Sequence, residues 1–309
     1  MKPINTSEAS RVNINKNIAY LYNDIPYKNN SFSITLSKLF AEWHSILKHI
    51  LKTVKKENST AYWIALITCA LSIVCILGLV IDKRMLLGVN VWIKPLKFTI
   101  SIAIYIITTS FLLSIYPYSK RKKGIINGIV SWSLLIELGI IICQAARGVQ
   151  SHYNVSTGFD AILYMSMGLL TGINVFIIIV LMIDSLRLKL KTKKSIQWSI
   201  FLGLTIIFFS SWIGGQMISQ LSHSVGVADG GAGLPLVNWS TVAGDLRIAH
   251  FFGLHGIQII PLFAFWLSKK SNTSSRNQII AVTVFSLLYA AWIGFVYYQA
   301  KQGIPLLAI

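Results

Sequence analysis

Seven long apolar runs, separated by short polar segments, dominate the pattern along this chain. Each run is close to the ~20 residues with which an α-helix crosses the hydrocarbon core of a bilayer. The pattern therefore predicts an all-α, polytopic membrane protein with seven transmembrane helices in one domain, 62–298. None of the runs has a break at its centre, and the chain shows no internal repeat. The runs cover 62–81, 92–116, 124–146, 159–183, 197–221, 248–267 and 277–298.

Two different patterns precede the first run. Residues 1–31 are polar and rich in Asn, a composition typical of a disordered tail. From 32 to 56, apolar residues recur at helical spacing and lysines occupy most of the other face. This pattern predicts an amphipathic helix in the cytoplasmic membrane interface; the alternative is that the helix packs on the cytoplasmic loops of the protein itself. At the other end of the chain, residues 299–309 are expected to form a short outer tail.

The composition agrees with a membrane location. Of the 309 residues, 54% are hydrophobic and 12% are charged, whereas a soluble domain has about 25% charged residues. The three cysteines, Cys69, Cys75 and Cys143, lie inside apolar runs. They are therefore expected to pack as small apolar residues and not to form a disulfide framework or a metal cluster.

The formal charge of +18 is spread unevenly over the segments between the runs. Every second segment, beginning with the N-terminal one, is rich in Lys and Arg, and together these segments hold 21 of the 28 such residues. Since cytoplasmic loops carry the excess of positive charge, the N-terminus is expected inside and the C-terminus outside. The basic residues are spread over all the inner segments, which argues against a nucleic-acid partner. The expected partner is the lipid bilayer.

With this topology, most polar residues of the spans fall in the outer half of the membrane. Lys94 and Lys97 share one face at the start of the second span, while Arg147 and Arg247 lie near the ends of other spans. This cationic set favours a small anionic ligand that arrives from the outer side. The alternative for the two lysines is that they extend to the lipid headgroups and hold no ligand.

Two acidic residues are candidates for chemistry. Glu137 lies near the midplane of the third span, where a carboxylate must be paired, hydrogen-bonded or protonated. A structural ion pair with a Lys or Arg of a neighbouring helix is the alternative to a functional role. Asp160 follows Thr157 at the spacing of a capping box, with Asp in place of the usual Glu. It therefore either caps the fourth span or takes part in a site.

Four histidines are candidate metal ligands: His152, His223, His250 and His255. Neutral imidazole is a ligand for haem iron, zinc and copper. His250 and His255 are five residues apart, about 140° around a helix, so they cannot hold one metal jointly from a straight helix. Each could instead pair with a histidine of another helix. The alternative for every one of the four is an interhelical hydrogen bond.

The remaining candidates are grouped by role. Those for catalysis are Glu137, Asp160 and His255, and those for ligand binding are Lys94, Lys97, Gln144, Arg147, Gln216, Gln220, Arg247 and Gln258. Apart from the two lysines, these residues and the four histidines are expected to line one cavity that opens outward. The reason is energetic, because each polar group left against lipid would cost on the order of a few kcal/mol.

Three segments carry a resemblance to a known family: Lys94-Pro-Leu-Lys-Phe98, Ser151-His-Tyr-Asn154, and Gly244-Asp-Leu-Arg through Gln258. In these segments the chain resembles an uncharacterised family of bacterial seven-helix integral membrane proteins. The resemblance covers roughly 85–300 and leaves out the N-terminal tail and the amphipathic helix. It implies a multi-pass location in a bacterial cytoplasmic (inner) membrane, and it implies no activity or ligand.

Three functions are compatible with these features, and whether the protein is an enzyme stays open. The first is a membrane enzyme or redox protein that holds haem or a divalent metal at its outer face. The second is a transporter or receptor for a small anionic ligand, although the unbroken runs and the missing repeat count against a transporter. The third is a membrane-embedded, metal-dependent lipid hydrolase, which fits the helix count and the Ser, Asp and His inventory.

Overall fold

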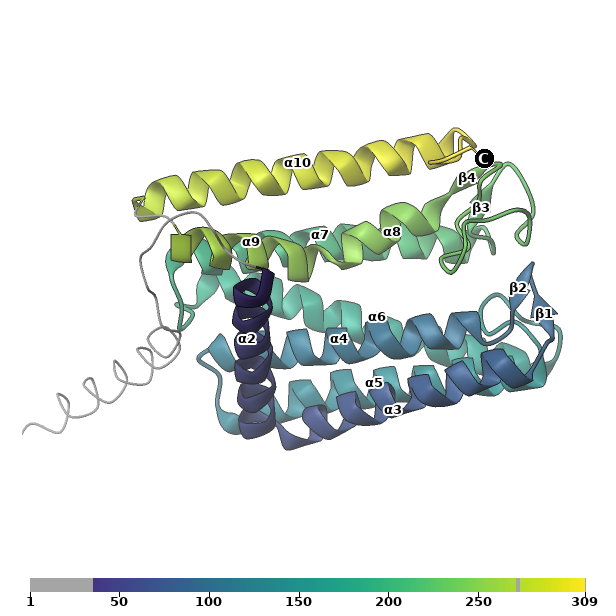
Figure 1. The fold of residues 1–309 in the computed structure, drawn as a ribbon, viewed down its shortest axis with the longest axis horizontal. Helices are drawn as coiled ribbons and strands as arrows, with labels where there is room; N and C mark the ends of the chain where they lie inside the picture. The colour runs from purple at the N-terminus through teal and green to yellow at the C-terminus, as the bar shows by residue number, and fades with distance from the viewer. Residues whose placement is uncertain (1–35, 271–272, 309) are drawn as a thin grey trace, which may run out of the picture. The chain divides into compact units, whose positions relative to one another are not determined.

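Helices make up most of the described chain, residues 36–270 and 273–308. The computed structural model contains nine helices over these residues, α2 to α10, and two short two-stranded antiparallel sheets (Figure 1). The polar tail expected at 1–31 lies outside them. The chain divides into two units, one up to Thr53 and one from Val54 onward, and each is described by itself.

Helix α2, Leu36–Glu57, confirms a helix over the described part of the amphipathic segment expected at 32–56; residues 32–35 lie outside the described residues. Phe40, Trp43 and Leu47 follow one another at helical spacing and are exposed. Lysines and a histidine occupy much of the remaining surface of the helix. The location of α2 in a membrane interface stays a prediction.

The second unit has the expected all-α, multi-pass architecture. Within the described residues, six single helices are long and apolar enough to cross a membrane, and a bent pair of helices brings the number to seven if it counts as one span. The long helices run side by side in Figure 1. The single helices are α3 (Ser59–Ile81), α4 (Ile93–Ile115), α5 (Lys120–Arg147), α6 (Gly158–Arg187), α7 (Lys194–Ser219) and α10 (Ser275–Lys301), and the bent pair is α8 (Leu246–Leu254) with α9 (Gly256–Lys270).

The expectation of an unbroken span over 248–267 is wrong. Helices α8 and α9 meet at an angle of 43°, with His255 between them. Two glycines explain how the bend packs, because a Cβ on Gly203 of α7 would come within 2.9 Å of the Gly256 carbonyl oxygen. A Cβ on Gly256 would in turn come within 2.8 Å of Ile206. The bend therefore brings the start of α9 directly onto the backbone of α7, a close approach typical of small residues in membrane helices.

The helices form two groups that α6 connects. Helices α3, α4 and α5 pack on one another, and α8, α9 and α10 pack around α7. Helix α6 contacts α5 on one side and α7 on the other. Each group has its own apolar core: Ala61, Ile64, Ala65, Ile102, Ile106 and Leu138 in the first, and Ile213, Met217, Leu246, Ile248, Ala249, Ile293, Val296 and Ala300 in the second.

One end of this bundle carries the longer loops and both two-stranded sheets, and is called the loop end below. It comprises the hairpin of β1 (Met85–Leu86) and β2 (Val89–Asn90), residues 148–157, and residues 220–245. The last segment contains β3 (Ser224–Val225), which pairs with β4 (Gly244–Asp245). The backbone at Gly244 lies against α10 so closely that a Cβ there would be 1.9 Å from the Ala300 carbonyl oxygen. This contact fixes the long loop over the bundle.

Candidate functional site

A cavity of about 1060 Å³ lies inside the second unit, toward the loop end. Its wall combines apolar side chains of α4 to α8 with polar side chains from the helices and the loop segments. Glu137, His223, His250 and His255, which the sequence led us to expect in one pocket, all line it. The other charged or strongly polar residues of the wall include Lys94, Lys97, His152, Asp229, Arg247 and Gln258.

Lys94 and Lys97 stand at the start of α4, half-buried, with both side chains on the cavity wall. Nζ of Lys94 lies 3.1 Å from Nδ1 of His152, and Nζ of Lys97 donates to the carbonyl oxygen of Val237 at 3.0 Å. Among the ion pairs of the described residues, neither lysine has a carboxylate partner. Neither amino group is therefore neutralised by a direct ion pair.

Arg247 lines the same cavity, but its charge is compensated. Its guanidinium donates to both carboxylate oxygens of Asp245, at 2.9 Å from Nε and 2.6 Å from Nη2. Nη2 also donates to the carbonyl oxygen of Asn238. Asp245 in turn accepts from the backbone N–H of Arg247 at 2.9 Å, so it caps α8. Arg247 is thus part of the fixed frame that joins the long loop to α8.

His223 and Asp229 form a hydrogen-bonded pair on the cavity wall, with 2.8 Å between Nδ1 and Oδ2. Burial lowers the pKa of His223, and this outweighs the opposite effect of the bond to Asp229. Burial would raise the pKa of Asp229, but the hydrogen bonds from His223 and Ser224 hold it well below its usual range. A neutral ring that donates from Nδ1 leaves Nε2 as an acceptor.

Asp229 was not among the residues singled out from the sequence. It lies in a Gly-rich segment, where nothing in the local pattern indicates which carboxylate a histidine will meet. Besides the ring of His223 it accepts from the backbone N–H groups of His223 and Ser224, at 3.0 and 2.9 Å, and from the hydroxyl of Ser222. The same carboxylate therefore also orders this part of the loop.

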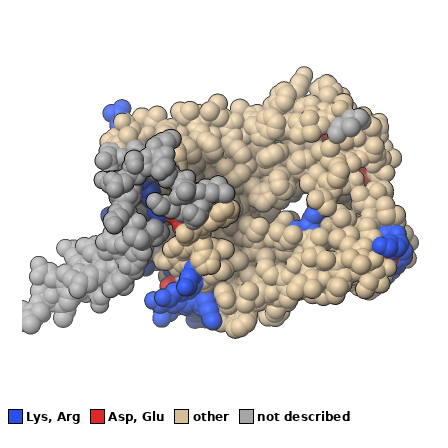
Figure 2. Space-filling model, viewed as in Figure 1, with Lys and Arg blue, Asp and Glu red and all other residues tan. Residues whose placement is uncertain are grey.

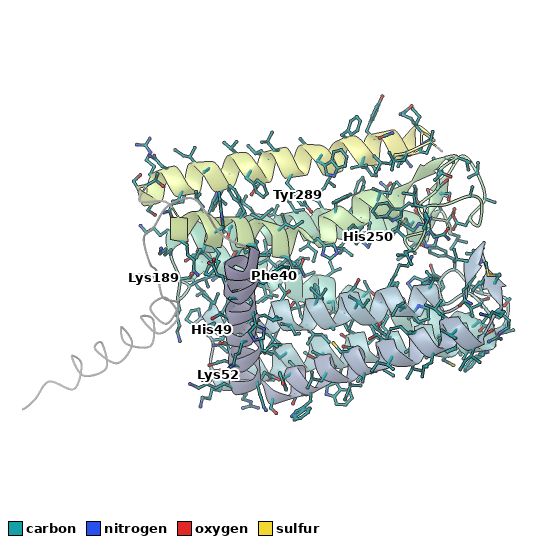
Figure 3. The ribbon with its side chains drawn as sticks, viewed as in Figure 1. Phe40, His49, Lys52, Lys189, His250 and Tyr289 are labelled. Carbon is teal, nitrogen blue, oxygen red and sulfur yellow. The ribbon has the colours of Figure 1, made fainter. Side chains whose placement is uncertain are left out.

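The four histidines do not converge on a common point. His152 contacts Lys94, and His223 contacts Asp229. Nδ1 of His250, on α8 in Figure 3, lies 2.8 Å from the carbonyl oxygen of Ser210. The ring of His255, at the bend, packs on Phe251 with 4.5 Å between ring centroids. Each of the four histidines has a separate contact, and the bond of His250 to Ser210 is the one that joins two helices, as the alternative considered from the sequence requires.

The expected histidine metal cluster consequently finds no support in this geometry. Over residues 36–270 and 273–308, no three His, Cys, Asp or Glu side chains lie together in a way that could hold a metal ion. The physical reason is that the rings come from two different loops, from α8 and from the bend. The backbone of each of these segments places its histidine ring beside a different partner.

Glu137 lines the cavity from α5, and the hydroxyl of Thr171 on α6 donates to it at 3.3 Å. None of the ion pairs among the described residues includes Glu137, so the structural ion pair considered from the sequence is not formed. Three polar atoms of the cavity wall are, unlike Glu137, buried without a hydrogen-bond partner: the Tyr164 hydroxyl, Oδ1 of Asn174 and Oε1 of Gln258. Buried polar atoms normally have a partner, so water or a ligand is expected beside them.

Three of the predicted site residues form a separate network away from this cavity. Gln144 and Arg147 both donate to Oδ1 of Asp160, at 2.8 and 2.5 Å. Thr157 donates to the other carboxylate oxygen at 2.7 Å and accepts from the backbone N–H of Asp160, as a helix cap does. The lining of the cavity includes none of the three. Asp160 therefore ties the start of α6 to the end of α5, and its expected place on the cavity wall is wrong.

Gln216 and Gln220 also face away from the cavity. Gln216 accepts from the hydroxyl of Tyr297 on α10 at 2.8 Å, and Gln220 donates to the carbonyl oxygens of Ser222 and Ser224. The turn of α7 instead directs Gly214, Gly215, Met217 and Ile218 to the cavity. The two glutamines share a helical stripe, as the sequence indicates, but the stripe faces α10 and the loop.

No protein family, no curated protein and no solved structure matches this chain.

Proposed function

We propose that this protein binds the anionic group of a small ligand in the cavity at the loop end, as a membrane receptor or transporter. The observation that carries the proposal is the pair of lysines, Lys94 and Lys97. Both line the cavity, and neither has a carboxylate partner among the described ion pairs. Two like charges beside each other in a partly dehydrated site repel, and an anion between them relieves this repulsion.

The three arginines near the loop end are already paired. Arg84, Arg147 and Arg247 each have a carboxylate, supplied by Asp82, Asp160 and Asp245 respectively. An incoming anion would have to displace those partners, whereas it meets no carboxylate at the lysines. Charge-assisted hydrogen bonds from lysine to a phosphate or carboxylate are among the stronger polar contacts in proteins.

The bend at His255 favours a transporter over a fixed receptor. Transporter sites are typically built where a membrane helix is broken, near the middle of the bilayer. His255 and Gln258, on either side of the start of α9, both line the cavity. The objection that the apolar runs have no central break therefore no longer applies to this helix.

The proposed location is a bacterial cytoplasmic membrane, with the loop end on the outer side. The bacterial assignment rests on the resemblance described above. The sidedness rests on the distribution of positive charge, because Lys120–Lys123 and the basic segment 187–194 lie at the end of the bundle opposite the loop end. Cytoplasmic loops carry such an excess.

The test measures thermal unfolding of the full chain in phosphatidylcholine nanodiscs. Inorganic phosphate and dodecyl phosphate are titrated, with dodecyltrimethylammonium as the cationic control. An anion at about 100 times its Kd should stabilise the protein by about 2.7 kcal/mol, and the variant Lys94→Gln/Lys97→Gln should lose this effect. Lys301→Gln, an exposed lysine outside the cavity, is the matched control. Equal stabilisation of all three proteins, or none by either anion, would remove the proposal.

A second candidate function is hydrolysis, favoured by the His223–Asp229 pair on the cavity wall. In this arrangement Nε2 of His223 could accept the proton of an attacking water while Asp229 stabilises the resulting imidazolium. His223→Gln should then abolish turnover of a bound ester or phosphate ester and leave binding intact. If His223→Gln changes only the stability of the loop, the pair has the structural role alone.

A further inference from the structure

We infer that the ligand is an anionic amphiphile, with a long apolar chain, that enters the cavity from the lipid bilayer between α4 and the α8–α9 pair. This inference rests on the proposed function and names its ligand class. Two observations carry it beyond the lysine pair: the cavity opens sideways between these helices, and the edges of the opening are mainly apolar.

The opening follows from the way the helices pack. Helix α4 packs on α3 and α5, whereas α8 and α9 pack on α7 and α10. Residues of α4 and of the α8–α9 pair face each other across the cavity, and the extensive helix–helix interfaces of the described chain do not include one between them. Figure 2 shows a hollow between these two groups of helices, with Lys or Arg atoms at its edge.

Two polar contacts bound the opening along α4. Toward the loop end, Lys97 donates to the Val237 carbonyl oxygen at 3.0 Å, which joins α4 to the long loop. Toward the opposite end, Nε2 of Gln258 lies 3.4 Å from the hydroxyl oxygen of Thr108, which joins α9 to α4. Lys97 and Thr108 are eleven residues apart, so the opening is roughly 16 Å long at a rise of about 1.5 Å per residue.

Between these contacts the edges of the opening are mainly apolar, with Ser101 of α4 and His255 at the bend as polar members. Ile100 of α4 and Phe251 of α8 line the cavity and are nonetheless 51% and 41% exposed. Tyr105 and Leu254 continue the two edges toward the closed end. An exposed apolar edge in a spanning helix faces lipid, and an alkyl chain that passes along it exchanges one apolar environment for another.

The charge lies where the headgroup of such a molecule would be. Lys94 and Lys97 are in the first turns of α4, at the loop end of the opening, and the apolar edges continue from them toward the bilayer interior. A phosphate or carboxylate headgroup at the lysines therefore places its chain along Ile100 and Leu254. The carboxylate of Glu137 does not lie on the edge of the opening. Glu137 is on α5, whereas the opening is formed by α4 and the α8–α9 pair.

The experiment uses the full chain in phosphatidylcholine nanodiscs and a hexadecyl phosphate that carries a diazirine in its chain. After illumination, labelled peptides are mapped by mass spectrometry, with unlabelled hexadecyl phosphate, hexadecyl phosphocholine and inorganic phosphate as competitors. The variants Ile100→Trp and Leu254→Trp narrow the opening. Ile129→Trp is their control, because Ile129 is exposed on α5 and does not line the cavity.

Saturable labelling within 97–108 and 251–258 is expected, and unlabelled hexadecyl phosphate should compete at least about tenfold better than hexadecyl phosphocholine. Lys94→Gln/Lys97→Gln should weaken labelling about tenfold or more, as the loss of charge-assisted bonds implies. Both Trp variants at the opening should reduce labelling several-fold, and Ile129→Trp should not.

Two results would overturn the inference in different ways. If inorganic phosphate competes as well as hexadecyl phosphate, and neither Trp variant at the opening reduces labelling, the site binds an anion that arrives from water; the proposed function then stands and the lipid route fails. If labelling spreads over all exposed helix faces and ignores the lysine substitutions, the probe is only surrounding lipid, and both proposals fail.

Discussion

Nζ of Lys94 lies 3.1 Å from Nδ1 of His152, and Oγ of Ser151 approaches the same ring nitrogen at 3.1 Å. An ammonium has no acceptor, so the ring nitrogen that meets it must be unprotonated. Burial lowers the pKa of His152 well below its usual value, and the charges of Lys94 and His223 lower it further. The contact orients Lys94 without neutralising it, which leaves its charge for an anion.

The first prediction is that stability falls as the pH drops below about 6.5. The pKa values of His152 and His223 are lowered in the folded protein, whereas an unfolded histidine titrates near 6.5. Below that pH the unfolded chain binds more protons than the folded chain, so stability decreases, by about 1.4 kcal/mol for each unit of pKa difference at full effect.

Thermal unfolding between pH 7.5 and 5.5 measures this effect. His152→Gln should make the unfolding temperature less dependent on pH, while His44→Gln, at an exposed position of α2, should not. A wild-type unfolding temperature that is constant over this range would contradict the buried, neutral state of the two rings.

The second prediction separates the Asp160 network from ligand binding. Asp160→Ala removes the acceptor of Gln144, Arg147 and Thr157, and should lower the free energy of unfolding by about 1.5–3 kcal/mol. Lys122→Ala, which removes an exposed ion pair with Asp184, should cost less than about 1 kcal/mol. Anion affinity should be unchanged in both variants; a selective loss of affinity in Asp160→Ala would return Asp160 to the site.

The third prediction concerns the contact that fixes the long loop. Gly244→Ala would place a Cβ 1.9 Å from the Ala300 carbonyl oxygen, so either the loop or α10 must shift. We expect a loss of about 1–3 kcal/mol in stability, measured by thermal unfolding, together with weaker anion binding. At Gly139 a Cβ would meet nothing within 4 Å, so Gly139→Ala should be neutral or stabilising by up to about 1 kcal/mol. Similar behaviour of the two variants would show that the loop does not depend on this contact.

The fourth prediction is the sidedness of the bundle. A topology reporter fused after the C-terminus should report a location outside the cytoplasm. The same kind of reporter inserted near Lys193 should report a location inside the cytoplasm. The reason is the concentration of Lys and Arg at the end opposite the loop end. Reversed activities would place the lysine pair on the cytoplasmic side, and the ligand would then have to come from that side.

The fifth prediction tests haem and metal directly. With each of the four candidate histidines, His152, His223, His250 and His255, in a separate contact, the purified full chain should contain no stoichiometric metal and show no Soret absorbance band. A bound metal or haem that is lost in His223→Gln and His250→Gln would instead support the redox and metal-hydrolase hypotheses considered from the sequence.

The chain's apolar pattern was enough to predict its class and its helices, apart from the break between α8 and α9. Helix length in a membrane follows from the thickness of the bilayer, so runs such as 92–116 and 159–183 predict α4 and α6 to within a few residues at most ends. The amphipathic pattern of 32–56 likewise predicts α2. The polar residues that line the cavity, such as Glu137 and His250, are recognisable because lipid would penalise them.

Only the tertiary structure decided which of these residues belong together. The rotation of α7 turns Gln216 and Gln220 away from the cavity, and the capping geometry of α6 draws Asp160 to Arg147. The bend at His255 and the pairing of His223 with Asp229 depend on close backbone contacts and loop conformation. Residue spacing along a chain fixes which side chains share a helical face. The direction of that face depends on how the helices pack, and packing is a property of distant segments acting together.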